Sequence, residues 1–143
     1  LAHAGEEGRK AFAARVKSLM EDVPDLPNFS QFHEAFRTDA GKSTPEGNMR
    51  DAFFRAYKPE ECEYVPLFGK ACDDRLKKGP AMVSANFVIP YPPGFPIMVP
   101  GQVITEDTIT FMRKLDVKEI HGYERDKGLK LLRPDVLSKR AKR

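Results

Sequence analysis

Tryptophan is absent from this sequence, and cysteine and histidine are scarce: the 143 residues include two cysteines and three histidines. Cys62 and Cys72 are too few to build a disulfide framework, and neither has a second cysteine or a histidine at the spacing of a metal site. We therefore expect two free thiols, no metal centre, and a reducing compartment, the cytoplasm.

Long apolar runs and leader sequences are also missing. No run reaches the roughly 18 apolar residues that would span a bilayer, and the first residues have no secretory pattern. The net charge of +3 is small, whereas a protein dedicated to DNA or RNA concentrates lysine and arginine on one face. The sequence therefore predicts neither a membrane nor a nucleic-acid partner. A weaker alternative is an RNA-binding domain that uses the basic residues 139–143 and scattered aromatic side chains.

The common catalytic motifs are absent as well. The sequence has no glycine-rich phosphate loop, no HExxH and no GxSxG. Its histidines, His3, His33 and His121, lie far apart in the chain. We interpret His33 as a core or interface residue and His121 as a hydrogen-bonded structural residue. No lysine has the dry, phosphate-binding setting that is typical of a Schiff-base lysine. The chain alone is therefore predicted to be inactive as an enzyme.

The composition that remains is that of an ordinary globular protein, with 41% hydrophobic and 31% charged residues. A chain of this length suits one domain, so we expect a single domain over residues 1–143 with a flexible basic tail at 139–143. Because the first residue is Leu1 rather than methionine, we also expect the chain to be part of a longer polypeptide.

Helical periodicity dominates the first half of the chain. Apolar residues at helical spacing predict one helix over 6–22 and a shorter one over 30–37. A third helix is predicted with Ser43 or Thr44 as its N-cap, and Lys58-Pro59 ends it.

Strand signals appear after residue 60. Both faces of 82–89 are apolar, which predicts a central strand, and Pro66 predicts an edge position for its own strand. The expected elements are a strand over 63–68, a short helix over 71–78, a strand over 82–89, a helix over 106–115 capped by Thr105, and a hairpin of 120–123 with 129–132 around Gly128. The predicted fold class is α+β, with a helical first half, to about residue 58, packed on a small mixed sheet.

The segment 90–101 is unusual because five of the twelve prolines lie between Pro90 and Pro100. Proline removes a backbone donor, so this segment is not expected to form an ordinary strand ladder. We expect a stiff chain with turns at Pro93-Gly94 and Pro100-Gly101, and we consider a cis peptide before Pro92 or before Pro93. A stiff segment directly after a buried strand can form a wall or a lip with a fixed geometry.

An alternative interpretation of this segment is a polyproline ligand, which would make the chain a stand-alone protein-interaction module. That alternative requires Phe95, Ile97 and Met98 to be exposed in the free domain. The apolar residues Phe95, Ile97, Met98 and Val99 instead favour burial.

The stretch from Val83 to Gly101, V-S-A-N-F-V-I-P-Y-P-P-G-F-P-I-M-V-P-G, resembles a signature of one family. It is similar to the C-terminal domain of the bacterial ornithine/lysine/arginine decarboxylases, which are fold-type-I pyridoxal-phosphate enzymes. The resemblance is carried by Pro90-Tyr91-Pro92-Pro93-Gly94, Pro96, Pro100-Gly101, Val103-Ile104-Thr105-Glu106 and Ile120-His121-Gly122-Tyr123.

The resemblance implies the accessory domain of a larger enzyme that converts arginine, lysine or ornithine to an amine, a polyamine precursor, and carbon dioxide. Pyridoxal phosphate would be held by domains outside this chain, so no catalytic or cofactor-binding residue is assigned here. The implied partners are the catalytic domains of the same enzyme, in a homodimer or a larger assembly of dimers. Pro90, Tyr91, Pro92, Pro93 and Gly94 are the candidate channel wall or interdomain contact. The tripeptide His121-Gly122-Tyr123 slightly favours a resemblance to the arginine-type members of this family.

Overall fold

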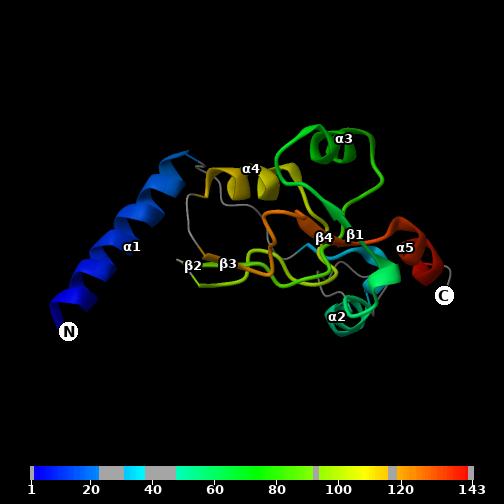
Figure 1. The fold of residues 1–143 in the computed structure, drawn as a ribbon, viewed down its shortest axis with the longest axis horizontal. Coiled ribbons are helices and arrows are strands. Elements are labelled where there is room, and N and C mark those ends of the chain that lie inside the picture. The colour runs from blue at the N-terminus through cyan, green and yellow to red at the C-terminus, as the bar shows by residue number, and fades with distance from the viewer. Residues whose placement is uncertain (1, 23–30, 38–47, 92–93, 116–118, 142–143) are drawn as a thin grey trace.

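The computed structural model describes residues 2–22, 31–37, 48–91, 94–115 and 119–141. The described part contains five α-helices, two short 3₁₀ helices and four strands (Figure 1). In chain order they are α1 (Ala2–Asp22), η1 (Glu34–Phe36), α2 (Met49–Arg55), η2 (Pro59–Glu61), β1 (Cys62–Val65), α3 (Lys70–Lys78), β2 (Ile89–Tyr91), α4 (Glu106–Lys114), β3 (Glu119–His121), β4 (Leu129–Leu132) and α5 (Pro134–Ala141). Because the paired strands are antiparallel, without alternating βαβ units, the predicted α+β class is confirmed.

The strand layer is built around β4 and the extended segment 82–88. β1 pairs with one edge of β4, in a register that sets Cys62 opposite Leu132. On the other side, Ala85 N–H donates to Lys130 O at 3.0 Å and Leu132 N–H donates to Val83 O at 2.9 Å. The segment 82–88 therefore has the predicted central position. It is not one regular strand, because Ser84 N–H turns to the opposite neighbour, Gln102 O, at 2.9 Å.

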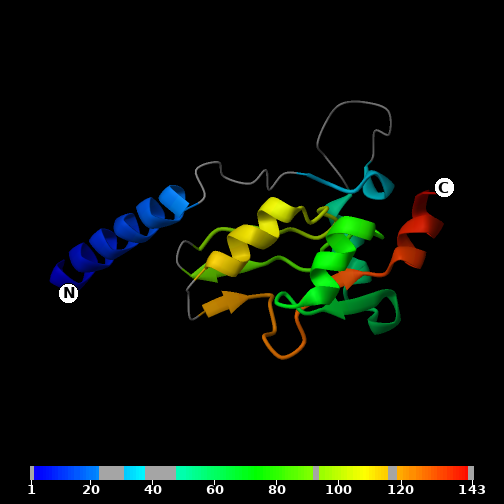
Figure 2. The same cartoon turned by 90° about the horizontal axis from the view of Figure 1, so that it is seen from above.

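Two hydrophobic clusters cover opposite faces of this layer. Figures 1 and 2 show α3 and α4 over one face of the strands, and Figure 1 shows α2 on the other side. The first cluster joins Cys72 of α3 and Ile109 of α4 to Leu131. The second joins Phe36 of η1, Ala52 of α2 and Leu137 of α5. Full burial of one large aliphatic side chain contributes about 1.5–3 kcal/mol, so both faces stabilise the sheet.

The helix α4 agrees closely with its sequence prediction. Thr105 is the N-cap, and its Oγ1 accepts a hydrogen bond from Thr108 N–H at 3.4 Å. Ile104 and Ile109 belong to the same buried cluster, as expected for a hydrophobic staple. The helix α3, Lys70–Lys78, and the edge strand β1, which stops before Pro66, also follow their predictions.

Two other helix predictions need correction. The predicted helix over 30–37 is only the short turn η1, because its first residues are extended: His33 N–H donates to Gly101 O at 2.8 Å and Val103 N–H donates to Gln31 O at 3.1 Å. The third helix starts at Met49, with Asn48 rather than Ser43 or Thr44 as its cap. The residues 38–47 lie outside the described part.

The helix α1 is slightly longer than predicted and lies apart from the other elements in both views (Figures 1 and 2). Its described side chains, residues 5–18, are exposed or half-buried, so the predicted apolar face is not covered. At the other end of the chain, residues 139–141 of the basic segment belong to α5. Within the described part, no helix has the length and apolar character that crossing a membrane requires.

The predicted hairpin of 120–123 with 129–132 is wrong. β3 pairs with β2 and β4 pairs with β1, so the two segments have separate partners. Gly128 passes so close to β1 that an added Cβ would lie 2.3 Å from Val65 O. A side chain at position 128 would collide with the backbone of β1, so glycine permits the close pairing of β4 with β1.

The imidazole of His33 is half-buried and occupied by local contacts. Its Nδ1 accepts a hydrogen bond from Ala35 N–H at 3.1 Å and so caps η1. Burial lowers the pKa of His33 below its usual 6.5, while the charge of Glu34 acts in the opposite direction. His33 also lines a cavity of about 210 Å³, and it is the one titratable residue among the described residues that line it. The remaining lining residues are Pro80, Ala81, Pro134, Leu137 and Ser138.

We expect the free energy of unfolding to fall as pH drops through about 6.5, because unfolded His33 binds a proton more readily than folded His33. The stabilisation is fully present above that pH and is lost as the pH approaches the folded pKa. His33→Asn keeps a capping acceptor but does not titrate. Urea unfolding at about pH 7.5 and 5.5 should show a larger loss for the parent chain than for His33→Asn. Equal losses would contradict the prediction.

Candidate functional site

The candidate segment begins in β2, which pairs with β3 in the register Ile89↔His121, Pro90↔Ile120 and Tyr91↔Glu119. The expectation that this segment forms no ladder is therefore wrong for its first two residues. A proline is tolerated here because β2 has a partner on one side only within the described part. Pro90 is buried, whereas Tyr91 is 45% exposed. Pro92 and Pro93, with both candidate cis bonds, lie outside the described residues.

Gly94 returns the chain to β2. Its N–H donates to Pro90 O at 2.7 Å, and its φ of +84° is a left-handed conformation that favours glycine. An added Cβ would lie 3.2 Å from Cε1 of Tyr91, so the aromatic ring packs over this glycine. Three of the five candidate residues, Pro90, Tyr91 and Gly94, are thus brought together in a turn.

The structure places two residues of β3 beside this turn. The sequence provided no reason to connect them with it. Glu119 and His121 alternate along β3 and so lie on the same face as Tyr91. His121 Nε2 lies 2.6 Å from Glu119 Oε1, which confirms the predicted hydrogen-bonded role of this histidine. The rings of Tyr91 and His121 meet edge to face, with centroids 5.0 Å apart. We name Pro90, Tyr91, Gly94, Glu119 and His121 the β2–β3 tip.

Beyond Gly94 the segment enters the core. Ile97 and Met98 are fully buried, and their burial agrees with the sequence prediction. Phe95 was also expected to be buried, but 48% of its surface is exposed. The interaction-module alternative required all three side chains to be exposed, so it fails for two of them. The predicted turn at Pro100-Gly101 is present, and Gly101 has a φ of +87°.

A second exposed surface lies on α2. Tyr57 and Phe54 are 71% and 55% exposed, and both meet Phe53 edge to face at 5.4 and 5.8 Å. Phe87 extends the group, with its centroid 6.1 Å from that of Phe53. We name Phe53, Phe54, Tyr57 and Phe87 the α2 aromatic face. Phe53 and Phe87 are half-buried, so the exposed part of this face is formed by Phe54 and Tyr57, and exposed apolar patches are candidate interaction surfaces.

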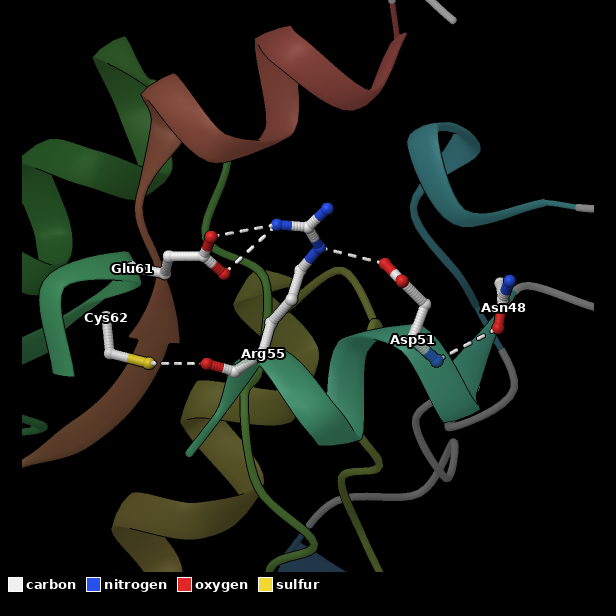
Figure 3. Close-up of polar contacts among 5 residues, drawn as sticks. All are labelled: Asn48, Asp51, Arg55, Glu61 and Cys62. Atoms are coloured by element: carbon white, nitrogen blue, oxygen red, sulfur yellow. Dashed lines mark hydrogen bonds and ion pairs between the residues drawn. The ribbon is translucent and has the colours of Figure 1, made fainter. Parts of the chain in front are cut away.

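A network of polar contacts holds α2 in place (Figure 3). Arg55 donates from Nε to Asp51 at 2.9 Å and from Nη1 to both oxygens of Glu61 at 3.0 and 3.1 Å. Burial by itself would lower the pKa of Arg55, but the two carboxylates outweigh it and the pKa is raised. Asn48 caps the helix through Asp51 N–H, and the Cys62 thiol faces Arg55 O at 3.7 Å. The network ties α2 to η2 through Glu61 and to β1 through Cys62.

The other residues that could act as nucleophiles or metal ligands are weak candidates. Cys62 and Cys72 are free, and burial raises the pKa of both thiols, so they stay protonated at neutral pH. No group of three or more His, Cys, Asp or Glu side chains is arranged to hold a metal ion in the part of the chain that the structure describes. The surfaces worth a functional interpretation are therefore the β2–β3 tip and the α2 aromatic face.

Comparisons with known proteins give a consistent result. The family model described as "Orn/Lys/Arg decarboxylase, C-terminal domain" matches residues 32–129. The lysine decarboxylase of Hafnia alvei is 37% identical over 135 residues, which cover 78% of this chain and 18% of that protein. The arginine decarboxylase of Bacillus anthracis is 37% identical over 65 residues, which cover 46% of this chain and 10% of that protein.

Among solved structures, the Francisella novicida lysine decarboxylase aligns with 86% of this chain and 17% of its own, at 26% identity and a TM-score of 0.43. This chain thus spans less than a fifth of the length of the relatives that it matches. The family model covers more than half of the chain, including the proline-rich segment that first indicated the resemblance. The chain belongs to the family of Orn/Lys/Arg decarboxylase C-terminal domains.

Proposed function

We propose that this chain is the C-terminal accessory domain of a pyridoxal-phosphate-dependent decarboxylase that converts arginine, lysine or ornithine to the corresponding amine and carbon dioxide. The family match over residues 32–129 carries this proposal. It is supported by similarity to lysine and arginine decarboxylases, of whose length this chain spans less than a fifth. The free thiols fit an enzyme of the cytoplasm.

The cofactor does not fit the residues of this domain. A pyridoxal-phosphate site needs a lysine in a dry pocket. Of the lysines whose side chains the structure describes, all but Lys130 are exposed, and Lys130 donates to Ala56 O at 2.8 Å. None of the described residues that line the cavity beside His33 is a lysine. The cofactor and the bond-breaking step therefore belong to other domains of the parent enzyme.

The role that we assign to this domain is to pack on those catalytic domains and to border the entrance of the active site. The exposed α2 aromatic face is suited to the packing, because burying such rings against another domain is favourable. Pro90, Tyr91, Pro92, Pro93 and Gly94 are the proposed lip, since a proline-rich turn holds its geometry with little loss of entropy. We expect a parent enzyme that is a dimer or an assembly of dimers.

The test begins with the native source. Every polypeptide that contains this sequence is isolated, its intact mass is measured, and its absorbance is scanned for a lysine–pyridoxal imine. Carbon dioxide release is then measured with arginine, lysine and ornithine. We expect a yellow species several times larger than 143 residues that acts on one of these amino acids. A colourless species of this size that releases no carbon dioxide would overturn the proposal.

A further inference from the structure

The β2–β3 tip places a carboxylate beside an electron-rich aromatic ring. Tyr91 and Glu119 face each other across the β2–β3 pair. His121 is hydrogen-bonded to one oxygen of Glu119, Oε1, at 2.6 Å. This contact uses one of the two carboxylate oxygens, so the second oxygen, Oε2, can accept a hydrogen bond from a ligand. Glu119 is 66% exposed, so a ligand from solvent can reach it.

Elsewhere in this chain the same two groups hold a cation. Lys127 Nζ lies 5.5 Å from the centroid of the Tyr64 ring and 3.0 Å from Glu124 Oε2. The ammonium is attracted by the face of the ring and by the carboxylate together. At the β2–β3 tip a tyrosine and a glutamate are again neighbours, because Tyr91 and Glu119 are directly opposite each other in the strand pair. Among the described residues, Glu119 is hydrogen-bonded to His121 and makes no salt bridge with a lysine or an arginine.

The conformation of the tip is also constrained before a ligand binds. Gly94 N–H donates to Pro90 O, and the missing side chain of Gly94 lets the Tyr91 ring lie against the turn. The rings of His121 and Tyr91 pack edge to face, and His121 is hydrogen-bonded to Glu119. A ring and a carboxylate whose positions are constrained in this way lose less entropy when they bind a small ion.

We propose that Tyr91 and Glu119 bind the cationic side-chain end of the basic amino-acid substrate, an ammonium or a guanidinium, and that His121 positions the carboxylate. This inference rests on the proposed function, because only there is the ligand a basic amino acid at the entrance of an active site. The tip then selects for positive charge before the substrate reaches the catalytic domains. Its residues act on binding and not on the chemical step.

The first test uses the parent decarboxylase at low ionic strength. Glu119→Gln should raise KM for the basic amino acid by about three- to tenfold with kcat unchanged, and high salt should abolish the difference, as for an exposed charge. Tyr91→Leu should raise KM by about threefold, whereas Tyr91→Phe, which keeps a ring, should not. Glu124→Gln is the matched control, since it removes an exposed carboxylate away from the tip. If Glu119→Gln and Glu124→Gln have equal KM values, the inference is wrong.

A second test does not depend on catalysis. The full 143-residue chain is titrated with arginine methyl ester and with norleucine methyl ester, which lacks the side-chain cation, while the His121 imidazole is followed by NMR. We expect a saturable shift with the arginine ester that is lost in Glu119→Gln. Equal shifts with the two esters would overturn cation binding. A parent protein without decarboxylase activity would instead overturn the proposed function, while this titration would still decide whether the tip binds cations.

Discussion

Gly122→Ala should lower the free energy of unfolding by about 3 kcal/mol or more, the largest loss that we expect from one added methyl group. Gly122 has a φ of +82°, and a Cβ at this position would lie 1.8 Å from Phe87 O. That distance is far shorter than any van der Waals contact, and the obstacle is backbone rather than a flexible side chain. The chain after β3 would have to move away from the segment before β2.

Guanidinium unfolding of the parent chain and of two variants measures this effect. Gly69→Ala is the matched control, because Gly69 also has a positive φ, +131°, but nothing lies within 4 Å of its added Cβ. The control should lose only the cost of backbone strain, about 1–3 kcal/mol. If the two variants lose the same stability, the predicted collision between Gly122 and Phe87 does not exist.

Phe36→Ala should cost about 3–5 kcal/mol, because it empties the centre of the second hydrophobic cluster. Phe36 has no exposed surface and contributes the largest side chain of that cluster. Its neighbours there are small or come from separate elements, so they cannot collapse into the space. They are Ala52, Ala56, Val83, Ala85, Leu132 and Leu137.

Thermal or urea unfolding of Phe36→Ala is best compared with Phe54→Ala. Phe54 lies on the α2 aromatic face and is 55% exposed, so its truncation in the isolated chain should cost less than about 1 kcal/mol. A similar loss for both variants would contradict the assignment of Phe36 to the core. A large loss for Phe54→Ala alone would show that the α2 aromatic face is buried in solution, against the structure.

The sequence predictions are correct where the interactions are short-range and wrong where distant segments of the chain meet. For α4, the cap, the staple and the apolar spacing all lie within ten residues of one another, and the prediction succeeds within one residue. For α2 the local signals were misleading, because Asn48 competes with Ser43 and Thr44 as a cap and the sequence alone does not rank them. The predicted hairpin failed because apolar alternation marks a strand without naming its partner.

The same distinction applies to the candidate site. Proline spacing alone marked residues 90–94, and together with the segments 103–106 and 120–123 it indicated the family. Glu119 and His121 lie about 30 residues further on, and no local pattern connects them with Tyr91. A signal did exist in the alternation of Glu119 with His121, but it becomes meaningful only when β3 is known to pair with β2.

For this protein, the order of the residues alone was enough to specify the α+β class, most of the helices and the family, because these depend on composition, short-range periodicity and a contiguous motif. The tertiary structure decided which strands pair, which phenylalanines are buried, and that Tyr91, Glu119 and His121 form one surface. Those outcomes depend on contacts between distant segments, whose free energies are set by the shape of the whole core and not by any single stretch of the chain.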